Sequence, residues 1–114
     1  MRTIGELSLS QNEQLALEEA KRRLTSEFPI EELIVFGSVA RGEATEESDL
    51  DLLALARRPM THLDDHAVSD AIFKINLSFG TNISVLVVDR VTWETGLWSV
   101  LPLHQDVIRD GVPL

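Results

Sequence analysis

Two aspartates, Asp49 and Asp51, stand two residues apart at the start of an apolar run that ends at Leu55. If residues 49–55 form a β-strand, both carboxylates point to one face, with their Cα atoms roughly 6.5–7 Å apart. Two negative charges on one face cost free energy unless a cation compensates them. Mg²⁺ suits the pair, because it takes one or two carboxylates together with water and substrate phosphate. Two such ions about 3.5–4 Å apart would stabilise an in-line phosphoryl displacement.

A second group of residues precedes this pair and suits a phosphate. Gly37 ends the short apolar run 33–36, and a residue without Cβ lets the backbone approach a ligand closely. The turn that starts at Ser38 offers free N–H groups and a hydroxyl to phosphate oxygens. Arg41 adds a forked cationic contact. For Ser48, a ligand contact and a turn hydroxyl bonded to nearby backbone are equally consistent with the sequence.

These residues together resemble a known signature. Gly37-Ser38 followed by Asp49-Leu50-Asp51-Leu52 resembles the motif of the DNA polymerase beta superfamily of nucleotidyltransferases, and the longer run with Ala40-Arg41-Gly42 and Ser48 resembles the small prokaryotic minimal nucleotidyltransferases. The resemblance covers most of the chain. It implies a nucleotidyltransferase-like fold and transfer of a nucleotidyl group, expected to be adenylyl, from ATP or another nucleoside triphosphate. It also implies nucleotide binding by Gly37, Ser38, Arg41 and Ser48, and catalysis and Mg²⁺ binding, with two ions expected, by Asp49 and Asp51.

One position departs from the family pattern. The resemblance implies a third acidic residue on the strand after the intervening helix, where it helps to bind metal and to activate the incoming hydroxyl. In residues 83–86 the equivalent residue is Ser84, a neutral hydroxyl. Asp89 lies five residues further along, near the far end of that strand, and we do not expect it to reach the same metals. General-base help is worth roughly 10²–10⁴-fold.

Three functional hypotheses follow. In the first, a Mg²⁺-dependent nucleotidyltransferase modifies a partner protein or another hydroxyl acceptor; the resemblance implies a HEPN-type helical partner in a toxin–antitoxin pair, with this chain as the antitoxin. In the second, a catalytically degenerate antitoxin neutralises its partner by binding alone, which Ser84 favours. In the third, the aspartates belong to a phosphatase of the haloacid dehalogenase type. That reading is weaker, because the aspartates open the strand and Leu53 takes the place of a hydroxyl residue.

The elements around these motifs follow from apolar periodicity. Residues 10–28 predict a helix with a capping box of Ser10 and Glu13, residues 61–80 a second helix ended by Gly80, and residues 33–36, 49–55 and 83–88 three strands. A last helix is expected from Trp93, capped by Thr92, with Leu97, Val100 and Leu101 on one face and broken or kinked by Pro102. An apolar tail follows an Asp110-Gly111 turn. The pattern predicts an α/β or α+β fold, a small mixed sheet covered by helices, as a single domain over residues 1–114.

The composition limits the remaining possibilities. Ten Lys and Arg against nineteen Asp and Glu give a net charge of -9, which opposes a broad nucleic-acid surface. The absence of cysteine, of a leader peptide and of a long apolar run predicts a cytoplasmic protein with no membrane span. His62 and His66 stand at the spacing of a helical metal pair, but no third ligand is evident, so a solvated helix face is the favoured reading. The sequence leaves homo- or hetero-oligomerisation open.

Overall fold

The computed structural model describes residues 3–45 and 48–114. Within these ranges the strands are β1 (Ile30–Phe36), β2 (Leu50–Ala56), β3 (Ile83–Asp89) and β4 (Val112–Pro113). The helices are α1 (Gln11–Glu27), α2 (Gly37–Arg41), α3 (His62–Phe79), α4 (Arg90–Thr95) and α5 (Pro102–Asp110), with 3₁₀ turns η1 (Ile4–Glu6) and η2 (Leu97–Val100). The predicted helices and strands up to residue 89 are all present in the predicted order, but a short helix, α2, stands where a turn was predicted at Gly37-Ser38.

The strands form one mixed sheet in the order β3-β2-β1-β4. β1 runs antiparallel to both β2 and β4, whereas β2 and β3 are parallel. A parallel pair needs a crossover connection, and α3 supplies it between β2 and β3. The mixed α/β architecture predicted from the sequence is therefore confirmed.

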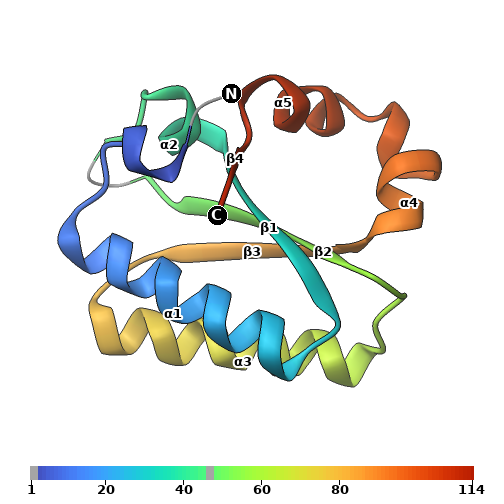
Figure 1. The fold of residues 1–114 in the computed structure, drawn as a ribbon, viewed down its shortest axis with the longest axis horizontal. Helices are drawn as coiled ribbons and strands as arrows, with labels where there is room; N and C mark the ends of the chain where they lie inside the picture. The colour runs from blue at the N-terminus through green and yellow to red at the C-terminus, as the bar shows by residue number, and fades with distance from the viewer. Residues whose placement is uncertain (1–2, 46–47) are drawn as a thin grey trace.

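The two faces of the sheet are covered differently. α1 and α3 lie side by side on one face, while α4 and α5 lie on the other (Figure 1). The short α2 follows the end of β1, and its buried Val39 and Ala40 belong to the core cluster of the first face. The first face packs Leu24 of α1 and Val68 of α3 against strand residues such as Leu52. On the second face Leu53 of β2 packs with Trp93 and others in a smaller cluster. Because side chains alternate along a strand, Asp51 shares the second face with Leu53.

Local signals fix the ends of the long helices as predicted. Ser10 accepts from the Glu13 N–H at 3.0 Å and the Glu13 carboxylate accepts from the Ser10 N–H at 2.9 Å, so the capping box is complete. Gly80 ends α3 with φ +65°, a conformation that glycine adopts without a Cβ penalty. β2 begins at Leu50, one residue later than predicted, so Asp49 stands just before the strand.

The C-terminal quarter corrects the sequence prediction. Asp89, not Thr92, caps α4, because the Asp89 carboxylate accepts both the Thr92 N–H at 3.0 Å and the Thr92 hydroxyl at 2.7 Å. The helix ends at Thr95, and Pro102 starts α5 instead of breaking a helix, since proline suits a first helical position. Three apolar residues predicted to share one helix face are instead exposed: Leu97, Val100 and Leu101.

Two further observations complete the architecture. The apolar tail adds β4 to the sheet, with Val112 opposite Val35 of β1. Among the described residues, no helix is both long and apolar enough to cross a membrane.

Candidate active site

The two predicted metal ligands lie where β2 begins. Asp51 is the second residue of β2 and half-buried, while Asp49 precedes the strand and is exposed. The pKa of the Asp51 carboxyl is raised, first because burial removes water from the carboxylate and second because the negative charge of Asp49 repels it; the cationic Arg41 acts in the opposite direction. The structure thus brings Asp49, Asp51 and Arg41 within electrostatic reach of one another.

Gly37 is fitted against Asp51. The backbone of Gly37 has φ +76°, and a Cβ built there would lie 2.3 Å from Oδ2 of Asp51. Phe36, the residue before it, is the register partner of Asp51 in the β1–β2 ladder. The pairing of the two strands therefore places the start of α2 directly beside the carboxylate, which only a glycine at position 37 permits without displacing it.

The other residues of α2 complete one side of the site. Ser38 is half-buried, and its hydroxyl has no hydrogen-bond partner among residues 3–45 and 48–114, so it is available to a ligand. Its carbonyl accepts the N–H of Glu43 at 2.9 Å, which closes the turn after the helix. The exposed Arg41 side chain is paired with Glu43 through Nε at 3.1 Å. An exposed pair of this kind is weak, worth about 0–1 kcal/mol, so a phosphate can compete for the guanidinium.

Ser48 takes the turn role that the sequence left open. Its hydroxyl accepts the Thr45 N–H at 3.0 Å, and its own N–H donates to the Thr45 carbonyl at 3.0 Å. These bonds close the loop that leads into Asp49. In this arrangement Ser48 supports the backbone at the entrance to β2.

Asn82 is a site residue that the sequence did not reveal. Its side-chain amide donates to Oδ1 of Asp49, and its backbone carbonyl accepts the Leu50 N–H at 2.9 Å. Asn76 of α3 in turn holds this segment: its side chain donates to the Ile83 carbonyl at 3.0 Å and accepts the Ile83 N–H at 2.9 Å. The sequence signals a turn at residues 80–82, but no local pattern encodes a contact with a residue 33 positions away.

The third acidic position is neutral in the structure as well. Ser84 is exposed and is the register partner of Asp51 in the parallel β2–β3 ladder. This is the position where the family resemblance implies a third acidic residue. Asp89 is paired with Ala56 instead, about 17 Å along the strands from Asp51. Since Asp89 also caps α4, it is too distant to act as the third carboxylate.

Asp49 and Asp51 suit a divalent cation that takes its other ligands from water and substrate phosphates. Among residues 3–45 and 48–114, no group of three or more His, Cys, Asp or Glu side chains gathers into a metal-binding cluster. Asp49 and Asp51 thus supply two carboxylates, and the pKa of Asp51 is raised first by burial and then by the negative charge of Asp49. Mg²⁺ is commonly held in this way, by one or two carboxylates plus water and substrate phosphates. The residues present therefore fit Mg²⁺ bound together with a nucleotide.

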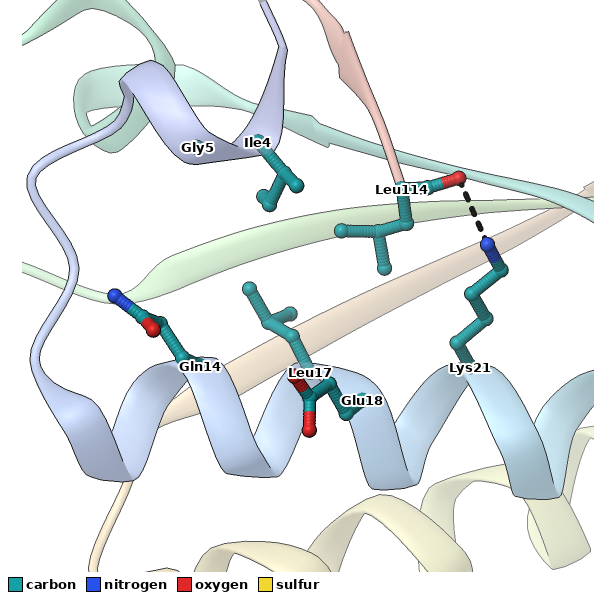
Figure 2. Close-up of a pocket in the computed structure, with 7 residues that line it drawn as sticks. All are labelled: Ile4, Gly5, Gln14, Leu17, Glu18, Lys21 and Leu114. Atoms are coloured by element: carbon teal, nitrogen blue, oxygen red, sulfur yellow. Dashed lines mark hydrogen bonds between the residues drawn. The ribbon is translucent and has the colours of Figure 1, made fainter.

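Two cavities differ in their position relative to Asp49 and Asp51. One adjoins these aspartates, and the other does not. A cavity of about 470 Å³ is lined in part by Val39, Thr45, Ser48 and Asn82, so it adjoins Asp49. Another, of about 250 Å³, lies between η1, α1 and Leu114 (Figure 2). There Lys21 donates to the Leu114 carbonyl at 3.2 Å, and no predicted site residue lines the cavity.

Comparison with known proteins agrees with this geometry. Residues 17–108 match the family model described as "Nucleotidyltransferase domain". The chain belongs to the nucleotidyltransferase domain family. This makes it a transferase by class, and the predicted fold class is confirmed. The match excludes the phosphatase reading.

Individual relatives cover nearly the whole nucleotidyltransferase domain. A protein of Methanocaldococcus jannaschii named "Putative protein adenylyltransferase" is 33% identical over 103 residues, 88% of this chain and 95% of the relative. A solved structure of a "putative minimal nucleotidyltransferase" has a TM-score of 0.60 and 34% identity, covering 94% of this chain and 99% of that one. The minimal nucleotidyltransferase resemblance is thereby confirmed.

A more distant structure shares the fold. A chain in the complex of a tri-AMPylated Shewanella oneidensis HEPN toxin with an MNT antitoxin has a TM-score of 0.53 and 20% identity, covering 88% of this chain and 69% of that one. At this identity the likeness establishes the fold alone.

Proposed function

We propose that this nucleotidyltransferase transfers an adenylyl group from ATP to a hydroxyl group of a helical partner protein, with Asp49 and Asp51 holding Mg²⁺. The observation that supports it best is the fit of Gly37 against the Asp51 carboxylate, 2.3 Å from a built Cβ, with Asp49 beside it. This fit joins the proposed phosphate-binding turn to the proposed metal ligands. The relative named as a protein adenylyltransferase favours a protein acceptor and an adenylyl donor.

The reaction forms a bond between the acceptor oxygen and the α-phosphorus of ATP and breaks the bond to pyrophosphate, which leaves. When bound, Mg²⁺ neutralises charge on the phosphates. Ser38 and Arg41 bind and orient the triphosphate, and Gly37 leaves room for it beside Asp51. Ser84 is neutral, so the acceptor proton passes to water or to a group of the partner. We therefore expect transfer to be slower than in an enzyme with the third carboxylate. The difference is up to the 10²–10⁴-fold that a general base contributes.

A separate chain is the proposed acceptor. The structure of 20% identity described above is a complex of an AMPylated HEPN toxin with an MNT antitoxin. We extend that arrangement to this chain. The partner would be a HEPN-type helical protein, and this chain its antitoxin.

The test is a transfer assay with a candidate HEPN-type helical protein as acceptor. Purified wild type, the partner, Mg²⁺ and ATP labelled in the α-phosphate are mixed, and label on the partner is measured. We expect label with wild type and a loss of at least a hundredfold with the Asp49→Asn/Asp51→Asn variant. Equal labelling by the two proteins would remove the catalytic proposal.

Ser84 favours a second candidate function. A nucleotidyltransferase fold without the third carboxylate would serve as an antitoxin that covers its partner and transfers nothing. In that case Asp51→Asn would leave neutralisation of the toxin intact in cells, and no label would reach the partner. Loss of neutralisation in Asp51→Asn, with the complex still formed, would reject this candidate.

A further inference from the structure

His62 and His66 stand at the start of α3, one turn apart and both exposed. α3 packs against the face of the sheet opposite Asp51, through buried residues such as Val68 and Ile72. The two histidines are therefore no part of the site that holds Asp49 and Asp51. Their side chains nevertheless converge: the two Nε2 atoms are 3.2 Å apart.

The two nitrogens lie at hydrogen-bonding distance, and two ligands of a single ion can have the same separation. If each Nε2 lies about 2.1 Å from a shared metal, a separation of 3.2 Å corresponds to an N–metal–N angle of about 100°. That angle falls between the roughly 90° of neighbouring octahedral or square-planar ligands and the roughly 109° of tetrahedral ones. The ring centroids are 4.6 Å apart and the ring planes meet at 88°.

We propose that His62 and His66 form a chelating site for a transition-metal ion such as Ni²⁺, Cu²⁺ or Zn²⁺. Imidazole nitrogen suits these ions, whereas the carboxylates at Asp49 and Asp51 suit Mg²⁺. The two sites thus select different metals.

The surroundings of the pair favour a cation. Asp64 and Asp65 lie in the same first turn of α3, and their negative charges offset the partial positive charge of the helix N-terminus. Asp64 is engaged in the capping box with Thr61, whereas Asp65 is exposed between the two histidines in sequence. The net charge of -9 adds a general attraction.

The site is open. Among the described residues no third His, Cys, Asp or Glu joins the pair, so water fills the remaining coordination positions of a bound ion. An open two-ligand chelate exchanges its metal readily and is able to accept a further ligand from outside the chain. It is therefore a binding site and not a closed structural one.

A register variant tests the chelate with the number of histidines held constant. His66→Ala/Ala67→His moves the second imidazole about 100° around the helix to another exposed position, about 140° from His62. Asp49→Asn/Asp51→Asn serves as the common background, so that the carboxylate site takes up no metal. Ni²⁺ binding is measured by titration calorimetry, and circular dichroism checks that both proteins are folded.

We expect the register variant to bind Ni²⁺ at least tenfold more weakly than its background. In NMR spectra, Ni²⁺ should broaden the ring signals of His62 and His66 before those of His104, which is packed against Trp93. Equal affinity in the two proteins would overturn the proposal, and so would broadening of His104 at the same Ni²⁺ concentration. Neither result depends on nucleotidyl transfer.

Discussion

Asp51 and Ser84 are register partners across the parallel β2–β3 ladder, so the neutral residue stands directly beside a proposed metal ligand. Ser84 is exposed, and a longer acidic side chain has space there. The position offers a way to restore the third carboxylate that the family pattern contains. It also separates the two candidate functions, because only an enzyme gains from the change.

We expect Ser84→Asp to raise the rate of adenylyl transfer about ten- to a hundredfold, since a positioned general base contributes roughly 10²–10⁴-fold. Single-turnover labelling of the partner with α-labelled ATP measures the rate. Ser84→Asn is the matched control, with similar size and no charge. If the Asp and Asn variants transfer at the same rate, a missing carboxylate is not what limits this chain.

Gly37 and Gly42 form a second matched pair. Their φ angles are +76° and +74°, but a Cβ at Gly42 meets nothing within 4 Å, whereas a Cβ at Gly37 meets Oδ2 of Asp51 at 2.3 Å. Alanine at either position costs about 1 kcal/mol of stability from the left-handed backbone alone. In Gly37→Ala the carboxylate must also swing away from the new methyl group.

The two glycine variants should therefore share the backbone cost in stability and differ in metal binding. We expect Gly37→Ala to weaken Mn²⁺ affinity, followed by electron paramagnetic resonance, about tenfold, and Gly42→Ala to leave it near the wild-type value. Urea denaturation reports the stability of both. Equal Mn²⁺ affinities would mean that the position of the Asp51 carboxylate does not depend on Gly37.

Local signals were sufficient for much of the fold. The spacing of apolar residues located α1, α3 and the first three strands, and the capping box at Ser10 and Gly80 fixed helix ends, because each depends on residues within one or two turns. The two-residue period of a strand predicted a shared face for Asp49 and Asp51, but Asp49 precedes β2, and its carboxylate is held by Asn82 instead. The family resemblance predicted Ser84 at the third acidic position, and the β2–β3 ladder pairs Ser84 with Asp51.

The features that the sequence did not predict have two causes. Either two local roles compete, or the feature depends on contacts between residues far apart in the sequence. Asp89 and Thr92 are both good cap residues, and only the folded chain decides that Asp89 accepts from Thr92. Pro102 can end a helix or begin one, and no neighbour in the sequence distinguishes the two. The hydrogen bond from Asn82 to Asp49 joins residues 33 positions apart, so it exists only once β2 and β3 have paired.

Asp89 should contribute to stability and not to transfer. The pKa of its carboxyl is lowered, first by the Thr92 hydroxyl and then by the Thr92 N–H, which both donate to it. A lowered pKa means that the cap stabilises the fold fully above the ordinary value of 3.8 and is lost as the pH falls through the lowered value. Asp89→Ala should cost about 1 kcal/mol at pH 7.

Urea denaturation across pH 2–7 checks this, with the difference between wild type and Asp89→Ala expected to shrink at the acid end. Asp89→Ser is the control, because serine caps a helix without a titrating charge. Its stability should stay near wild type at neutral pH. A loss of adenylyl transfer in folded Asp89→Ser would contradict the distance of about 17 Å that separates this residue from Asp51.

Asn82 should act as a positioning residue through Asp49. Its amide donates to Oδ1 of Asp49, which fixes the orientation of that carboxylate, and partners of this kind alter metal affinity or activity by 10–100-fold when removed. We expect Asn82→Ala to weaken Mn²⁺ binding about tenfold with little change in urea stability. Thr81→Val is the adjacent control, because the Thr81 hydroxyl donates to Asn76 and not to Asp49. A metal affinity unchanged in Asn82→Ala, or weakened equally in Thr81→Val, would mean that Asp49 keeps its orientation without the amide.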